Sequence, residues 1–590
     1  MSSLPEEEYL SRQLIAYIGN KRRLLGFLRS AFAQIEERGP VRSFMDPFCG
    51  SGAVARLARA MGYSVQANDW EMYAWVVTAA HLLIGRSDAD ELFRERGGIE
   101  RVFSGLNDVA SSPLMEGGSS HEAYIGRYYA PEETETADYR RERLFYTAEN
   151  GRFIDRARWV IEEQYPGWDL DERARKEKLL LVSSLIYEAA THANTSGVFK
   201  AFHKGFGGFG RDALGRILSP MKLEVPVLID SSRSCGVDRR DAADFIPLHT
   251  ADLCYLDPPY NQHQYGSNYH LLNTIALWDA PSVDHALTAD GSLKERAAIR
   301  KDWVKTRSSY CIPSRAAQTL RDLLERIDAR FIALSYNTEG FVSIEELYEM
   351  LSRQGRTEIM GTDYVLYRGG RQSVSRGTYN YEFLVICDRK SRPQGGDLRR
   401  VEGFLLRKRL DHLLKESYVP ERVRERFRES DGSISLTGGE LSLRMPFLHY
   451  FTRPLSEAEA SDIPTESVRE IIAGLEECRC RDRREEAAVL LSILRTAEAA
   501  GTADARDELP RIEQRLLRAV RKIAHRKYHD IFRETCGKVR AFAESAGLDR
   551  LLRRLGEIEA LAERRFSGGV HQEGPRDGGP SDRSGSPPVS

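Results

Sequence analysis

The chain has 590 residues, of which 41% are hydrophobic and 29% are charged, and this composition is ordinary for a soluble globular protein. A single compact core rarely reaches this length, so we expect two to four structural units. The formal net charge of −2 excludes a strongly basic protein. Any binding of nucleic acid must therefore come from local basic patches.

No stretch of about 18 apolar residues predicts a membrane span, and the first residues, which include Glu6, Glu7 and Glu8, do not form a secretory signal. The eight cysteines lack the spacing of a disulfide framework, and no CxxC pair is present to hold zinc. We therefore predict a protein of a reducing cytoplasm, without a metal site and without a membrane association.

The first part of the chain, residues 1–85, alternates between strands and helices. Residues 43–45 and 64–67 are typical of strands, and a helix is predicted for residues 53–61 between them. A turn that contains glycine, residues 46–52, joins the first strand to this helix. Because this alternation builds a parallel sheet with crossover helices, we predict the first, cofactor-binding half of an α/β, Rossmann-like core.

Residues 86–225 are helical and polar in pattern, with aromatic residues and arginines interleaved, which favours an insertion into the sheet domain. The second, catalytic half of the core is predicted for residues 226–392. Within it, a helix is expected at residues 316–327, and strands are expected at residues 253–256, 331–335 and 383–387.

Residues 391–396 contain Pro and two Gly and are typical of a linker. The pattern then becomes helical and heavily charged, so we predict a C-terminal, mainly helical module at residues 393–565. Residues 566–590 are rich in Gly, Ser and Pro and have no apolar periodicity, which predicts a disordered tail.

The turn at residues 46–52 has the sequence Asp-Pro-Phe-Cys-Gly-Ser-Gly. Glycines at such a turn let the backbone approach a ligand closely, and the amides at the start of the following helix face that ligand. A turn without a ligand is the alternative, because short glycine motifs are common. About twenty residues later, Asp69 ends the next strand, where a carboxylate can accept both hydrogen bonds of a ribose diol. A helix cap is the alternative role for Asp69.

A second motif, Asp257-Pro258-Pro259-Tyr260, also follows an apolar strand. Consecutive prolines fix the backbone, so their carbonyl groups point in set directions. A carboxylate beside such a carbonyl offers two acceptors to one NH2 group, and the ring of Tyr260 offers a flat face for stacking a nucleobase. A purely structural turn is the alternative interpretation. The glycine turn in the same predicted fold makes a chance occurrence of both motifs less probable.

These two motifs, in this order, resemble the alpha-group, Dam-like adenine-N6 DNA methyltransferases, in which the cofactor loop precedes the catalytic tetrapeptide. Residues 17–21, Tyr-Ile-Gly-Asn-Lys, are similar to the N-terminal cofactor motif of that family. Similar members often have arginine where His263 stands, which leaves the contact with phosphate or base at that point open. The resemblance spans roughly residues 13–388 and includes residues 150–158, 193–199, 265–270 and 334–337.

The resemblance implies a site-specific, adenine-specific DNA methyltransferase that uses S-adenosyl-L-methionine and binds double-stranded DNA in a bacterial cytoplasm. For the contact with the cofactor adenine, Asp241 is favoured because it follows a short strand-like stretch, but Asp244 stays open. The implied catalytic residues are Asp257, Pro258, Pro259 and Tyr260. The implied cofactor-binding residues are Tyr17, Lys21, Asp46, Phe48, Gly50, Gly52, Asp69 and Asp241.

The predicted chemistry is direct methyl transfer to an exocyclic amine, which is a poor nucleophile because its lone pair is delocalised into the ring. Hydrogen bonds from its two protons to Asp257 and to the carbonyl of Pro258 would localise that pair. The sulfonium donor is already activated, so most of the catalysis is positioning, without a metal or a covalent intermediate. A base inside a duplex cannot reach such a pocket, so the adenine must be flipped out.

Three stretches are candidates for contact with DNA. Residues 139–143 and 199–206 mix basic residues with aromatic residues and glycine, which suits phosphate contact and base stacking. The resemblance also places target recognition in this predicted insertion. In the C-terminal module, a basic stripe at steps of three or four residues predicts one face of one helix: Arg511, Arg515, Arg518, Lys522, Arg526 and His529. An apolar face is predicted at Leu516, Val520, Ile523 and Ile531. Ordinary solvated surfaces are the alternative for all three stretches.

The sequence therefore predicts an adenine-N6 DNA methyltransferase that acts in restriction–modification, in phage defence or alone. The alternatives are methylation of ribosomal RNA adenine, methylation of cytosine N4 in DNA, and a non-catalytic DNA-binding scaffold on the same fold. The C-terminal module is expected to bind a partner protein or to extend target recognition. The recognition sequence, the oligomeric state and the presence of a cognate restriction enzyme stay open.

Overall fold

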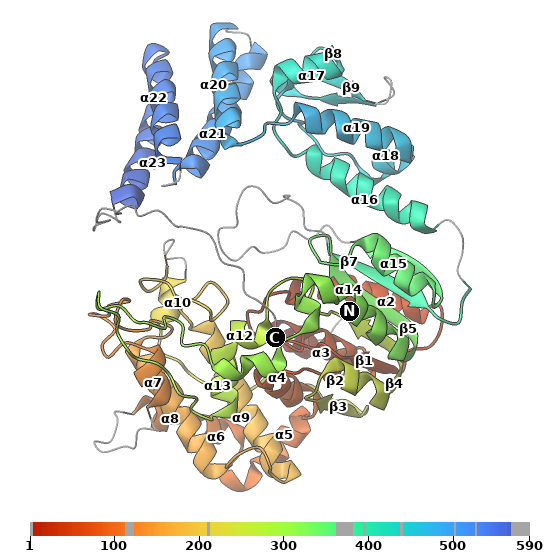
Figure 1. Cartoon of the computed structure of the whole chain (residues 1–590), viewed down its shortest axis with the longest axis vertical. Helices are drawn as coiled ribbons and strands as arrows, with labels where there is room; N and C mark the ends of the chain where they lie inside the picture. Colours follow the sequence, from red (N-terminus) through yellow and green to blue (C-terminus); the bar gives the residue numbers. More distant parts are fainter. Residues whose placement is uncertain are drawn as a thin grey trace, which may run out of the picture. The chain divides into compact units, whose positions relative to one another are not determined.

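The computed structural model describes residues 4–112, 123–208, 213–361, 382–392, 397–436, 441–500, 503–525 and 528–567. The chain divides into two compact units, residues 1–401 and 402–590, which are described separately (Figure 1). The predicted tail lies outside the described residues from residue 568 onward. In the part of the chain that is described, no helix combines the length and the apolar character needed to cross a membrane.

Among the described residues, the first unit is built on a seven-stranded sheet with the order β3-β2-β1-β4-β5-β7-β6 (Figure 1). Strands β1 to β5 are parallel to one another, and β7 runs antiparallel to both β5 and β6. This mainly parallel α/β architecture confirms the predicted Rossmann-like core. The strands are β1 (Ser43–Asp46), β2 (Ser64–Asn68), β3 (Cys235–Asp238), β4 (Thr250–Leu256), β5 (Asp328–Asn337), β6 (Arg356–Gly361) and β7 (Glu382–Asp388).

The helices of the first unit alternate with these strands or form a separate helical layer. They are α1 (Leu4–Ser11), α2 (Leu25–Glu36), α3 (Ala53–Ala60), α4 (Met72–Leu82), α5 (Arg86–Leu92), α6 (Ile99–Ser111), α7 (Tyr124–Tyr129), α8 (Ala148–Gln164), α9 (Glu172–Thr191), α10 (Leu214–Leu218), α11 (Ala242–Phe245), α12 (Tyr265–Asn268), α13 (His270–Leu277), α14 (Pro313–Arg326) and α15 (Ile344–Ser352). Short 3-10 turns include η1 (Lys21–Leu24), η4 (Lys301–Thr306) and η5 (Ser309–Cys311).

The order of the strands sets the place of the site. The chain runs from β1 outward through β2 and β3, and then returns to β4 on the other side of β1. Ligands of open α/β sheets bind at the carboxyl ends of the strands where the strand order reverses in this way. Met45 of β1 pairs with Cys254 of β4. The ends of these two strands, which carry the glycine turn and the Asp-Pro-Pro-Tyr tetrapeptide, therefore lie at the same edge.

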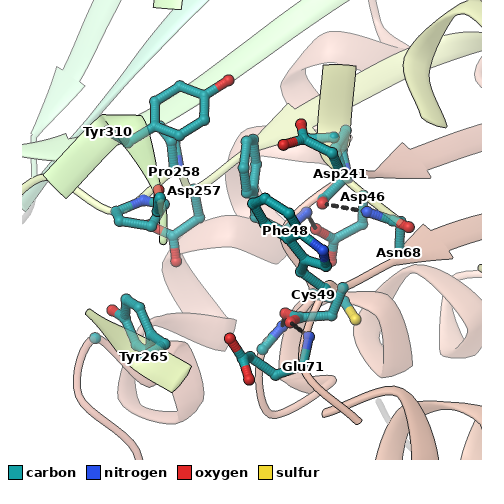
Figure 2. Close-up of a pocket in the computed structure, with 18 of the residues that line it drawn as sticks. Asp46, Phe48, Cys49, Asn68, Glu71, Asp241, Asp257, Pro258, Tyr265 and Tyr310 are labelled. Carbon is teal, nitrogen blue, oxygen red and sulfur yellow. Dashed lines mark hydrogen bonds between the residues drawn. The ribbon is translucent and has the colours of Figure 1, made fainter. Parts of the chain in front are cut away.

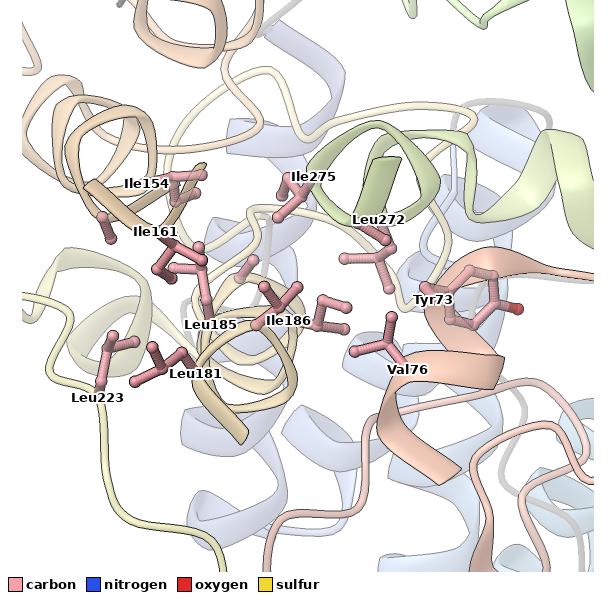
Figure 3. Close-up of a cluster of buried hydrophobic side chains, with 14 of the residues drawn as sticks. Tyr73, Val76, Ile154, Ile161, Leu181, Leu185, Ile186, Leu223, Leu272 and Ile275 are labelled. Atoms are coloured by element: carbon pink, nitrogen blue, oxygen red, sulfur yellow. The ribbon is translucent and has the colours of Figure 1, made fainter. Parts of the chain in front are cut away.

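The helical layer α5–α10 falls within the stretch between β2 and β3 that was predicted as an insertion. Helix α9 is its centre, and Leu181, Leu185 and Ile186 of α9 lie among side chains of α8, α4 and α13 (Figure 3). Helix α4 follows β2, whereas α13 follows the tetrapeptide. The layer is therefore packed against both halves of the sheet domain.

The edge strand β6 was missed from the sequence, and the edge strand β3 was recognised only as a short strand-like stretch before Asp241. The side chains of β3 are only half-buried, and those of β6 are mostly half-buried. Because edge strands bury less surface, their sequences lack the continuous apolar runs that marked β4 and β5.

The second unit is mainly helical, as predicted, but it also contains a three-stranded antiparallel sheet in the order β10-β9-β8 that was not predicted. Its three strands are no longer than four residues, which is too short for a clear periodic pattern. Its elements are α16 (Asp397–Leu413), α17 (Pro420–Arg426), β8 (Arg428–Ser430), β9 (Ser433–Leu436), β10 (Leu441–Arg444), α18 (Glu457–Asp462), α19 (Thr465–Cys478), α20 (Arg483–Ala500), α21 (Ala503–Ile523), α22 (His529–Ser545) and α23 (Asp549–Ser567).

The basic stripe predicted on one helix of this unit is wrong in part. Helix α21 ends at Ile523, and His529 begins α22, so the stripe does not continue on a single face. Arg526 lies outside the described residues. Arg515 lies 4.4 Å from the centre of the Tyr450 ring and donates a hydrogen bond to the unit's own Ser417.

The predicted apolar face is also divided by the end of α21. Leu516, Val520 and Ile523 are buried in the core of the second unit. Ile531, by contrast, lies on α22.

Candidate active site

A cavity of about 340 Å³ lies at the carboxyl ends of β1, β2 and β4 (Figure 2). Of the predicted site residues, eleven line it: Tyr17, Lys21, Asp46, Phe48, Gly50, Asp69, Asp241, Asp257, Pro258, Pro259 and Tyr260. Gly52 does not line it. Instead Gly52 precedes α3 with a φ of 76°, where an added Cβ would lie 2.9 Å from the side chain of Thr78. The structure thus brings the predicted residues together, while their individual roles stay predictions.

The glycine turn and Asp69 form one hydrogen-bonded wall of the cavity. The Gly50 N–H donates to one carboxylate oxygen of Asp69 at 2.9 Å, and the Glu71 N–H donates to the other at 2.9 Å. Burial raises the pKa of Asp69 to about 6. The carboxylate is therefore held in place by backbone amides, and each oxygen keeps a lone pair for a further donor.

Gly50 has a φ of 52°, and a Cβ built on it would lie 2.9 Å from the ring of Tyr17. We expect Gly50→Ala to weaken cofactor binding at least about tenfold, because both the backbone strain and the contact with Tyr17 deform the turn. Gly62→Ala is the matched control, since Gly62 also has a positive φ but has open space around its Cβ. Calorimetric titration with the cofactor should separate the two variants. Equal affinities would show that the close approach to Tyr17 has no role in binding.

An aromatic stack holds the N-terminal turn at residues 17–21 against the chain that follows the tetrapeptide. The Tyr17 ring stacks on Tyr269 with centroids 4.9 Å apart and on Tyr265 with centroids 5.1 Å apart. The Ile18 N–H donates to the Tyr269 hydroxyl at 2.7 Å, and the Tyr265 hydroxyl donates to the Ile18 carbonyl at 3.2 Å. These contacts fix Lys21 beside the tetrapeptide, although the two are far apart in the sequence.

Asp46, the last residue of β1, is buried at the floor of the cavity (Figure 2). One of its carboxylate oxygens accepts a hydrogen bond from the Phe48 N–H at 3.3 Å, whereas the other accepts none from any described residue. Burial, together with the nearby Asp257, raises the pKa of Asp46 well above its ordinary value. Buried acceptors are rarely left without a donor, so this oxygen fits a ligand that carries one.

Four side chains form a charged cluster at the tetrapeptide. The buried Lys21 ammonium lies 3.0 Å from Asp257 Oδ1 and 3.2 Å from Glu382 Oε2. The Tyr260 hydroxyl donates to Glu382 Oε1 at 3.4 Å. Burial lowers the pKa of Lys21, but the two carboxylates together raise it above its ordinary value. Lys21 is therefore a permanent cation in this cluster.

The same cluster controls the ionisation of Asp257. Burial raises the pKa of Asp257 to about 6, Lys21 opposes this shift, and Glu382 adds to it.

The tetrapeptide is also anchored through its backbone, because the Phe341 N–H donates to the Tyr260 carbonyl at 3.0 Å. The Tyr260 ring packs edge-on against Tyr336 with centroids 5.5 Å apart.

Several residues at the cavity were missed from the sequence. Glu382 begins β7, and only the antiparallel pairing of β7 with β5 brings it to Lys21. Glu71 lines the cavity, accepts a hydrogen bond from Asn273, and has its pKa raised to about 7 by burial. Residues 306–310 also line the cavity. None of these positions belongs to a motif with its own recognisable spacing.

Asp241 and Asp244 differ in the structure. Asp241 lines the cavity and caps α11 by accepting a hydrogen bond from the Ala243 N–H at 2.8 Å. Asp244 is not among the lining residues. This placement favours Asp241 as the acidic residue next to a bound cofactor.

The two predicted DNA-contact stretches of the first unit lie together. The prediction is wrong for one residue in them, Arg143, which is buried. Lys204 lies 5.1 Å from the centre of the Tyr139 ring, and both lysines of the second stretch, Lys200 and Lys204, are exposed. Arg143, in contrast, is 1% exposed and donates to the backbone carbonyls of Glu295 and other residues. Arg143 therefore links backbone segments within the first unit, and its guanidinium is not available to DNA phosphates.

A sequence profile of the D12 class N6 adenine-specific DNA methyltransferase matches residues 17–94 and 178–350. The first matched segment contains Tyr17, Lys21 and the glycine turn, and the second contains Asp241 and the tetrapeptide. The chain belongs to the D12 class of N6 adenine-specific DNA methyltransferases. The predicted family and enzyme activity are thereby confirmed.

Three relatives of this D12 class methyltransferase illustrate the extent of the match. The type II methyltransferase M.NlaIII of Neisseria lactamica is 29% identical over 63% of this chain and 99% of its own length. The type II methyltransferase M.CviAII of Paramecium bursaria Chlorella virus 1 is 25% identical over 63% and 99%. The modification methylase StsI of Streptococcus sanguinis is 28% identical over 63% and 52%. The chain therefore covers nearly all of two relatives and about half of the third.

The profile match does not extend over the whole chain. The profile omits residues 95–177, which hold α6–α8, and it ends at residue 350, so the second unit lies outside it.

Proposed function

We propose that this methyltransferase transfers the methyl group of S-adenosyl-L-methionine to N6 of an adenine that is flipped out of double-stranded DNA at a specific sequence. The observation that carries the proposal is that the glycine turn after β1 and the Asp-Pro-Pro-Tyr tetrapeptide after β4 share one cavity. A donor site and an acceptor site must be adjacent for direct transfer, and these two motifs supply them.

The cavity residues suit the methyl donor. Asp46 offers a buried oxygen that accepts no hydrogen bond from the residues that the structure describes. Asp69 offers an oriented carboxylate at the end of β2, and Gly50 permits close approach of a ligand to the backbone. Tyr17, Phe48 and Asp241 would complete the binding surface. When bound, S-adenosyl-L-methionine supplies a methyl group that its sulfonium already activates.

The tetrapeptide suits the exocyclic amine of adenine. We assign the Asp257 carboxylate and the Pro258 carbonyl as the two acceptors for the N6 protons, and the Tyr260 ring as the stacking surface. Lys21 keeps Asp257 ionised at neutral pH. Correct positioning of the reactants contributes about 7–11 kcal/mol to such a reaction. Stacking contributes about 1–3 kcal/mol and offsets part of the cost of flipping.

The names of the relatives, which are type II methyltransferases and modification methylases, support a role in restriction–modification. Phage defence and solitary methylation are compatible with the same chemistry. We propose that the enzyme acts on DNA in the cytoplasm of a bacterium. The second unit, residues 402–590, is proposed to bind a partner protein or to extend target recognition.

The direct test of this function is to map methylated bases in genomic DNA from cells with and without the protein. The expected result is N6-methyladenine within one short sequence, present only in cells that contain the protein. Identical adenine methylation in both genomes would refute the proposal.

The role of the second unit can be tested by ending the chain at Arg392. All residues that line the cavity lie in the first unit. We therefore expect the shortened protein to bind the cofactor with unchanged affinity and to methylate DNA, as measured by calorimetry and by transfer of labelled methyl groups. Loss of cofactor binding in a folded fragment would show that the second unit completes the site.

A further inference from the structure

The connection between α13 and α14, residues 278–312, contains neither an α-helix nor an extended strand. It nevertheless leads directly into the active site, because residues 306–310 line the cavity. Irregular connections of this length in a compact domain commonly carry function. We define residues 301–307, Lys-Asp-Trp-Val-Lys-Thr-Arg, as the lip of the cavity.

One buried arginine holds the lip at its base. Arg300 is 5% exposed and donates to both carboxylate oxygens of Asp279, at 3.2 and 2.7 Å. It also donates to both oxygens of Asp302, at 2.7 and 2.8 Å. Bidentate pairs of this kind fix geometry as well as charge. Both oxygens of Asp302, the one carboxylate of the lip, are therefore paired with Arg300.

The far end of the lip is tied to the chain that follows the catalytic tetrapeptide. The Gln264 side chain donates to the Ser308 carbonyl at 3.0 Å and accepts from the Ser308 N–H at 2.8 Å. A Cβ added to Gly266 would lie 2.7 Å from the Thr306 hydroxyl, which shows how closely the lip meets α12. The lip is therefore fixed with respect to Asp257 and Tyr260.

The lip combines three exposed cations, of which Arg307 also lines the cavity, with one exposed apolar side chain. Lys301, Lys305 and Arg307 are exposed, and none of them forms an ion pair with a described residue. Between them, Val304 is 57% exposed, which is as much as any large apolar side chain in the described chain. Val304 is two residues from Thr306 and so lies within about 7 Å of the cavity wall along the chain.

We propose that the lip binds duplex DNA at the target base pair, with Lys301, Lys305 and Arg307 at the phosphates and Val304 in the space that the flipped adenine leaves in the stack. This inference rests on the proposed function, because only extrusion of a base creates such a space. An apolar side chain that enters a base step stabilises the unstacked state, and the cations supply affinity that does not depend on sequence. Because Arg300 fixes the base of the lip, the three cations and Val304 keep a constant position relative to the cavity.

The wedge role is tested by comparing Val304→Ala with the wild-type protein on two duplexes that contain the recognition sequence. In one duplex the target adenine is paired with thymine, and in the other it lies opposite an abasic site. We expect kcat/KM to fall about tenfold on the paired target and to change less than about twofold on the unpaired one, where the cost of extrusion is small. Leu248→Ala is the matched control, because Leu248 is also 57% exposed, lies outside the predicted insertion and does not line the cavity. This control should behave as wild type on both duplexes.

An unchanged rate on the paired target, or equal losses on both targets, would overturn the wedge role. Failure of the wild-type protein to methylate either duplex would instead refute the proposed function, so the two failures are distinguishable.

The phosphate contacts are tested by the salt dependence of duplex binding. Each phosphate contact contributes about 0.9 to the slope of log affinity against log salt concentration. Lys301→Gln, Lys305→Gln and Arg307→Gln should therefore each lower the slope by about that amount, with the recognition sequence unchanged. A slope equal to that of the wild type in all three variants would overturn the phosphate contacts.

Discussion

Asp257→Ala is expected to reduce the rate of methyl transfer by about a hundredfold to a thousandfold, because it removes the charged acceptor assigned to one N6 proton. Cofactor affinity should stay close to that of the wild type, since the proposed binding residues for the donor are Asp69, Asp46 and the glycine turn. Single-turnover transfer of a labelled methyl group and calorimetric titration with the cofactor measure the two quantities separately.

The control for this prediction is Asp257→Asn, which keeps a neutral acceptor in place. It should retain more activity than Asp257→Ala, because the amide oxygen can still accept one hydrogen bond. Methyl transfer by Asp257→Ala at the wild-type rate would remove Asp257 from the reaction. A parallel loss of cofactor binding would show instead that the variant disrupts the whole cavity.

Lys21→Met is expected to lower activity at pH 7 by between about twofold and about ninetyfold, because a rise of one to three units in the pKa of Asp257 protonates half or more of this carboxylate. The pKa of Asp257 is raised to about 6, so wild-type activity should fall as the pH drops through about 6. Removal of the Lys21 ammonium, 3.0 Å away, raises this pKa further, typically by one to three units for a close opposite charge. The acidic limb of kcat/KM should therefore move to higher pH.

Glu382→Gln gives the opposite sign and serves as the matched partner of this variant. The Glu382 carboxylate raises the pKa of Asp257, so its removal should move the acidic limb below that of the wild type. The double variant Lys21→Met with Glu382→Gln should lie between the two single variants. Identical acidic limbs in all four proteins would show that Asp257 is not the group whose ionisation controls the reaction.

The core of the fold was predictable because strong local patterns coincide there with glycine and proline. Residues 43–67 alternate strand, turn, helix and strand, and the structure places β1, α3 and β2 within two residues of the predicted bounds. The edge strand β6 and the small sheet of the second unit were not predictable, because short or half-exposed strands leave little pattern.

The candidate site was predictable where its residues lie in compact motifs at strand ends. Glu382 could not be found in this way, since it meets Lys21 only after β7 has paired antiparallel with β5. Arg143 shows the opposite failure. Its basic neighbours suggested a DNA contact, but burial turns its guanidinium toward backbone carbonyls.

The function proposed for this cavity is the delivery of a methyl group to N6 of adenine in duplex DNA. The most direct measurement is to incubate the purified protein with S-adenosyl-L-methionine labelled in its methyl group and with duplex DNA or, in a parallel reaction, with RNA. The labelled nucleoside is then identified by mass spectrometry. We expect label in N6-methyldeoxyadenosine, and almost none with Asp257→Ala. Label in N4-methyldeoxycytidine, or label in RNA but not in DNA, would contradict the proposed function.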